Sequence, residues 1–139
     1  MYGIEFVEAD VPRWHADVRY YDVYDRATDS QRGRFVGGVY LDLYPREGKY
    51  SHAAAAPTYP ASTLAQRRSV SVMMANFNRQ GLNSSELRTL LHEFGHVLHG
   101  VLSTAKYAGQ AGTSVKRDGH VGNPVDPERV RRLVAAVGA

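Results

Sequence analysis

Residues 83–102 read NSSELRTLLHEFGHVLHGVL, and this stretch predicts a single amphipathic helix. Asn83 or Ser84 can cap its N-terminus, and Glu86 stands where a capping-box partner of Asn83 would stand. Gly95 costs about 1 kcal/mol relative to alanine inside a helix, which suggests that another backbone or a metal site lies close to it. Apolar side chains recur at spacings of three and four residues and predict one buried stripe: Leu87, Leu90, Leu91, Phe94, Leu98, Val101 and Leu102.

The same helix carries His92-Glu93-Phe94-Gly95-His96, which fits the H-E-x-x-H pattern. Residues four apart stack on one helix face, so the imidazoles of His92 and His96 can reach a common metal ion. Glu93 projects beside them, where it can act as a general base toward water. Only three positions define this pattern, so the alternative is a chance arrangement on a solvated helix. The capped helix and its apolar stripe favour a zinc site.

A zinc site needs a third protein ligand, which the pattern does not supply. His99 lies seven residues after His92, about 10 Å along the helix axis, which is too far for both to bind one ion. We therefore expect His99 to be a supporting or surface residue. Acids at the start of a short predicted C-terminal helix are also explained by capping and the helix dipole. The remaining candidates are Asp118, His120, Asp126 and Glu128.

The chain before this helix reads as β structure. Residues 18–24 and 35–44 are rich in β-branched and aromatic residues, and Gly37-Gly38 suggests a bulge or a close backbone approach. Residues 51–68 contain several alanines and prolines and are predicted to be mostly irregular. Residues 69–77 read as another strand. The predicted fold is α+β, with a small antiparallel sheet packed on the helix that carries the histidines.

Composition narrows the class of protein further. The 139 residues are 43% hydrophobic, contain no cysteine and have a formal net charge of +3. Disulfides and thiolate metal sites are therefore excluded. No stretch is long enough to span a membrane, and the N-terminus lacks the pattern of a secretory signal, so we expect a cytoplasmic protein. The basic residues are dispersed, which argues against nucleic-acid binding.

Four blocks of the chain together resemble the thimet oligopeptidase family of zinc metallopeptidases, which includes oligopeptidase A and bacterial peptidyl-dipeptidase. The blocks are residues 41–50 (LDLYPREGKY, followed by SHAA), 71–77 (SVMMANF), 92–100 (HEFGHVLHG) and 112–118 (GTSVKRD).

The resemblance implies a zincin-like fold, bound Zn²⁺ and cleavage of short peptides. It implies zinc ligation by His92 and His96 and general-base catalysis by Glu93. It also implies that residues 71–77 form the edge strand that holds the substrate backbone by strand addition.

The resemblance ends after Asp118. The family continues with Phe-Val-Glu-Ala-Pro, whose glutamate is the third zinc ligand, whereas Val121 stands at that position here. We therefore divide the chain into a partial zincin-like catalytic region, residues 1–118, and a divergent tail with a short helix, residues 119–139. This division predicts weak zinc binding and weak or absent peptidase activity for the chain alone.

Two other interpretations follow from the missing glutamate. In one, the chain is an autonomous minimal peptidase, and His120 or Glu128 supplies the third ligand. In the other, it is an inactive, zinc-poor fragment or an interaction module, whose exposed apolar surface would promote self-association.

Overall fold

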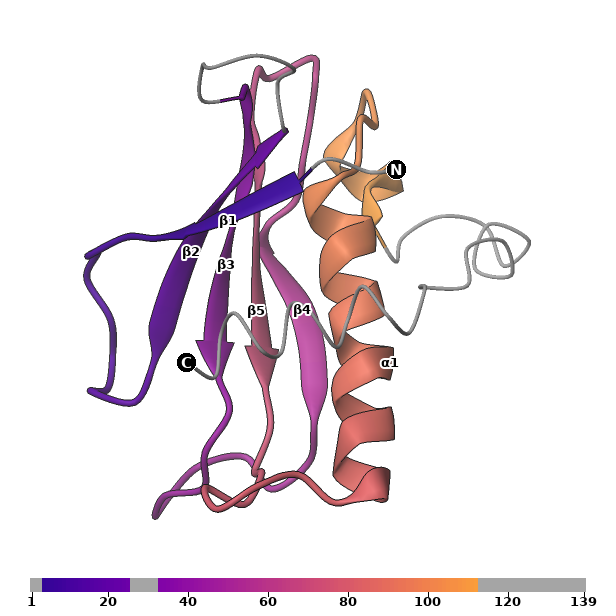
Figure 1. Cartoon of the computed structure of the whole chain (residues 1–139). Helices are drawn as coiled ribbons and strands as arrows, with labels where there is room; N and C mark the ends of the chain where they lie inside the picture. Colours follow the sequence, from indigo (N-terminus) through magenta and orange to yellow (C-terminus); the bar gives the residue numbers. More distant parts are fainter. Residues whose placement is uncertain (1–3, 26–32, 113–139) are drawn as a thin grey trace.

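The computed structural model describes residues 4–25 and 33–112 (Figure 1). Within these ranges a sheet of five strands packs against one long helix, α1. A single 3₁₀ turn, η1, follows the helix. The elements in chain order are β1 (Ile4–Glu8), β2 (Arg19–Asp25), β3 (Phe35–Asp42), β4 (Ala54–Tyr59), β5 (Ser69–Met74), α1 (Ser84–Val101) and η1 (Ala108–Gln110). The predicted α+β class is confirmed.

The sheet is mixed, with the strand order β1-β2-β3-β5-β4. The pairs β1–β2, β2–β3 and β4–β5 are antiparallel, whereas β3 and β5 run parallel. The prediction of an antiparallel sheet is therefore wrong for the central pair. The chain passes from β3 to the far edge to form β4 and then returns between them, so β5 must run in the direction of β3.

The edge of the sheet beside α1 is β4, in a segment that was predicted to be irregular. Alanine and proline are depleted in strands, so the composition of this segment does not predict a strand. Proline is tolerated at sheet edges because an outward-facing position needs no N–H, and Pro57 lies in β4. The assignment of residues 71–77 as an edge strand is also wrong, because β5 pairs with β3 on one side and with β4 on the other.

The two glycines in β3 allow close approach of neighbouring groups, as predicted, and the strand runs through them without a break. A Cβ atom at Gly37 would lie 2.5 Å from the carbonyl oxygen of Ser69, and one at Gly38 would collide with the hydroxyl of Tyr20. The register of β2 against β3 shifts at Val23 and Tyr24, opposite this region.

The N-terminus of α1 is capped as predicted. Asn83 Oδ1 accepts hydrogen bonds from the backbone N–H groups of Ser85 and Glu86, and Glu86 accepts from the N–H of Asn83 at 2.9 Å. In the described part of the chain, no helix is both long and apolar enough to cross a membrane.

The buried face of α1 is rotated slightly from the predicted stripe. Leu90, Phe94 and Val101 are buried as expected, whereas Leu102 is 39% exposed. Val97 and Gly100 are buried although the predicted stripe did not include them.

The helix and the sheet come close together at Gly100, because a Cβ atom there would lie 3.0 Å from Ser71 Oγ. This contact sets how near α1 approaches β5.

At the end of β3, Asp42 is 1% exposed and holds a cluster of charged groups. Arg46 donates two hydrogen bonds to its carboxylate, at 2.6 and 2.8 Å, and Trp14 Nε1 donates another at 3.0 Å. Lys49 Nζ lies 2.9 Å from Asp42 Oδ1 and also donates to the carbonyl oxygens of Asp42, Tyr44 and Ala75. Burial opposes ionisation, but the bonds from Arg46, Lys49 and Trp14 outweigh it and lower the pKa of Asp42 below its usual value. We name Trp14, Asp42, Arg46 and Lys49 the Asp42 cluster.

Candidate functional site

Two histidines on α1 bring their ring nitrogens together. The Nε2 atoms of His92 and His96 lie 3.1 Å apart, and the rings meet nearly edge to face with centroids 4.7 Å apart. Two donors bound to one zinc at 2.0–2.1 Å in tetrahedral geometry are separated by about 3.3 Å. The pair therefore has close to the spacing that a zinc ion requires of two ligands.

The same spacing also permits a hydrogen bond between the two rings when no metal is bound. One neutral imidazole then donates through Nε2–H and the other accepts, so the two rings need different tautomers. His92 is exposed and His96 is half-buried, which leaves the shared nitrogens near solvent. Both rings can bind a metal ion through Nε2 once the donating ring moves its proton to Nδ1, and this change needs no large movement of the helix.

Glu93 follows His92 in the helix and is half-buried. Successive residues are rotated by about 100° around a helix, so Glu93 projects beside the face that carries the two histidines. The capping box and the buried face of α1 hold this stretch as regular helix. The sequence-predicted base and the two predicted ligands thus lie on adjoining faces of one element.

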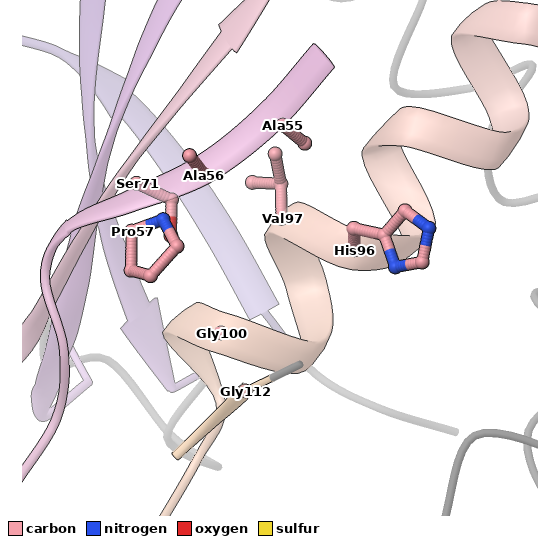
Figure 2. A pocket seen from close by; sticks show the side chains of 8 residues that line it. All are labelled: Ala55, Ala56, Pro57, Ser71, His96, Val97, Gly100 and Gly112. Carbon is pink, nitrogen blue, oxygen red and sulfur yellow. The ribbon is translucent and has the colours of Figure 1, made fainter. Parts of the chain in front are cut away.

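A pocket lies between α1 and β4, with His96 at its rim (Figure 2). Figure 2 shows Val97 directed toward Ala55 and Ala56 of β4, whereas the His96 ring points away from them. Its enclosed space is about 10 Å³, which is room for about one water molecule. Its lining comes from Ala55, Ala56, Pro57, Ser71, His96, Val97, Gly100 and Gly112.

The walls of this pocket were missed by sequence reasoning. Ala55, Ala56 and Pro57 belong to β4, which the sequence did not predict as a strand. Val97 lay outside the predicted apolar stripe of α1. The useful signal was the small size of these residues, since Gly100 and the alanines leave room that larger side chains would fill. A polar floor is added by Ser71, which is 2% exposed.

The described residues include His92 and His96, the two side chains that we expect to bind zinc, but no third ligand. Within residues 4–25 and 33–112, no group of three or more histidine, aspartate or glutamate side chains is placed to hold a metal, so His99 does not complete the pair. The other predicted candidates, Asp118, His120, Asp126 and Glu128, lie outside the described residues, as do Val121 and the proposed division at residue 118.

Comparison with known proteins identifies the family. The sequence model described as "Peptidase family M3" matches residues 1–119. A thimet-like oligopeptidase from Dictyostelium discoideum is 36% identical over 126 residues, which cover 84% of this chain and 18% of that protein. Oligopeptidase A of Escherichia coli is 37% identical over 124 residues, covering 82% of this chain and 18% of its own length.

A dipeptidyl carboxypeptidase from Escherichia coli is 32% identical over 125 residues, which cover 85% of this chain and 18% of that protein. The chain thus spans about a fifth of the length of these curated relatives. The match covers α1 with its histidine pair, the whole described sheet and the pocket between α1 and β4. The resemblance inferred from the four sequence blocks is confirmed, and the chain belongs to peptidase family M3.

Proposed function

We propose that this chain carries the central part of a zinc-dependent oligopeptidase site that hydrolyses short peptides. In this proposal His92 and His96 hold the zinc ion and Glu93 is the general base. The observation that supports it most strongly is the 3.1 Å separation of the two Nε2 atoms. Membership of peptidase family M3 supports the type of reaction.

The chemistry at Glu93 follows from its position beside the histidines. A bound zinc ion would supply a water molecule whose pKa is lowered to around 7. Glu93 takes one proton from the attacking water as its oxygen adds to the peptide carbonyl carbon. It returns that proton to the leaving amine when the C–N bond breaks.

The peptide substrate is held, in this proposal, by the edge of β4 that has no strand partner among the described residues. This edge borders the pocket whose rim is His96, and α1 packs beside it. An extended peptide that adds to a sheet edge gains main-chain hydrogen bonds without any requirement for a particular sequence. That property suits an enzyme that accepts many short peptides. A helix of this kind beside the edge strand of a mixed sheet is the zincin-like arrangement that we assign.

Two histidines alone should hold zinc weakly. Loss of an outer-shell partner already lowers metal affinity or activity about 10–100-fold, and loss of a ligand should lower it further. Val121 at the position of the family's glutamate therefore predicts slow turnover by the isolated chain. The tail, residues 119–139, is then a divergent addition to the family-like region.

Peptide hydrolysis tests this proposal directly. A quenched fluorogenic peptide should be cleaved slowly by the chain with added zinc, and Glu93→Gln should abolish that cleavage because the base is lost. The matched control is Glu47→Gln, which removes an exposed carboxylate in the loop after β3 and should leave the rate unchanged. Cleavage that persists in Glu93→Gln would contradict the assignment of the base.

Fast, Glu93-dependent cleavage would contradict the weak two-ligand site instead. It would favour the autonomous peptidase, in which His120 or Glu128 completes the site. His120→Ala and Glu128→Ala, each assayed for tightly held zinc, would then identify the third ligand. No cleavage and no zinc binding at any concentration would favour the inactive, zinc-poor fragment.

A further inference from the structure

The backbone groups that β4 offers to a peptide can be derived from Pro57. In an antiparallel ladder, residue pairs alternate between those that exchange both N–H···O bonds and those that exchange none. Pro57 is paired with Ser71 and has no N–H, so this pair is of the second kind. The backbone groups of Pro57 therefore face away from β5.

The alternation then assigns the neighbouring residues. Ala56 pairs with Val72 and Ala54 with Met74, and these pairs hold β4 to β5. Ala55 faces outward, as Pro57 does. The open edge consequently presents the N–H and C=O of Ala55 but only the C=O of Pro57.

The ladder becomes irregular immediately after Pro57. The register shifts between Pro57 and Tyr59, and the hydroxyl of Thr58 donates to the carbonyl oxygen of Val70 at 2.8 Å. Pro57 is exposed and lines the pocket whose rim is His96. The incomplete position of the edge is thus accessible and lines the same pocket as His96.

We propose that Pro57 is a specificity-determining residue that stops the substrate ladder after Ala55. The proposal rests on the function assigned above and concerns which peptides the site prefers. An antiparallel peptide exchanges two hydrogen bonds with Ala55, and its N-terminal side extends toward Pro57. The peptide residue opposite Pro57 finds an acceptor for its N–H, but its own carbonyl meets the proline ring in place of a donor.

As a consequence, lengthening the N-terminal segment of the peptide beyond this point does not increase its affinity for the site. The hydrogen bond gained at Pro57 is offset by a carbonyl that loses water and finds no donor. Peptides that end opposite Ala56 avoid this loss. Pro57 thereby favours substrates with few residues on the N-terminal side of the position held by Ala55.

Peptide binding to the full chain tests this inference without relying on turnover. The Glu93→Gln chain is titrated with N-acetylated alanine-rich peptides of increasing length, labelled at the C-terminus and measured by fluorescence anisotropy. The dissociation constant should stop improving at a defined length. In Pro57→Ala, two further N-terminal residues should improve it about fivefold, because a backbone donor is restored.

Pro60→Ala is the matched control, since it replaces a proline outside β4 and should leave the length limit unchanged. Urea unfolding of each variant shows whether it folds. An identical length limit in Pro57→Ala, a gain on C-terminal extension instead, or no peptide binding at all would overturn the inference. A chain that shows the length limit but never hydrolyses peptides would support this inference while contradicting the proposed catalysis.

Discussion

The Asp42 cluster and the histidine pair are two polar regions among the described residues, and they are built in opposite ways. Asp42 and the side chain of Lys49 are 1% and 3% exposed, and four donor groups surround one carboxylate. His92 and His96 lie near solvent, with their Nε2 atoms 3.1 Å apart. The first region is complete without a ligand, whereas the second has the spacing of a ligand set. Stability and metal binding should therefore be separable by substitution.

The largest expected effect is on the Asp42 cluster. Asp42→Asn leaves Lys49 and Arg46 without a counter-charge at a buried site, so we expect a loss of about 3–5 kcal/mol in the free energy of unfolding. Urea denaturation measures it. Asp10→Asn removes an exposed partner of Arg13 and should change stability by less than about 1 kcal/mol. Equal effects of the two substitutions would contradict the contrast between the regions.

The same cluster makes stability depend on pH. The pKa of Asp42 is lower in the folded than in the unfolded chain. Its contribution to the free energy of unfolding is therefore fully present above the pKa of the unfolded chain, near 3.8. The contribution is lost as pH falls from there through the folded pKa. Urea unfolding measured at about pH 5 and at about pH 2 brackets the unfolded pKa. Between these two values, Asp42→Asn should lose less stability than the wild type.

An intermediate effect is expected at the candidate metal site. Val121→Glu introduces the glutamate that the family resemblance implies at this position, so we expect zinc to bind about 100-fold more tightly or better. Competition with a chromophoric chelator measures the dissociation constant. Val125→Glu adds the same charge to the tail as a control. His92→Ala in the Val121→Glu background should remove the gain, and stability without zinc should stay unchanged throughout. A gain of equal size in Val125→Glu would show only a charge effect.

The smallest effect is expected at the contact between Gly100 of α1 and Ser71 of β5. The added methyl group of Gly100→Ala meets Ser71 Oγ at 3.0 Å, so the variant should lose about 1 kcal/mol despite the better helix propensity of alanine. Ser71→Ala removes that oxygen, and Gly100→Ala should then be neutral or stabilising. A double-mutant cycle from urea unfolding gives the coupling energy. Additive effects would mean that this contact does not set the distance between α1 and β5.

Local signals predicted α1 and the proximity of His92 and His96, because capping, periodicity and a four-residue spacing all act within one helix. The position of β4 could not be predicted from local sequence signals. Its alanines and Pro57 form a strand only because β5 returns between β3 and the edge, which is a long-range event. The Asp42 cluster was missed for a similar reason, since Trp14 reaches Asp42 from 28 positions away.

The return of β5 between β3 and β4 also has a consequence for folding. Within the described sheet, β4 pairs with β5 alone, and β5 is synthesised later. The strand that we assign to peptide binding therefore emerges from the ribosome before its partner in the described sheet, and both of its edges are then unpaired. A proline within such a strand interrupts pairing with another copy. Pro57 would thus protect the nascent chain at the stage when β4 is most exposed to aggregation.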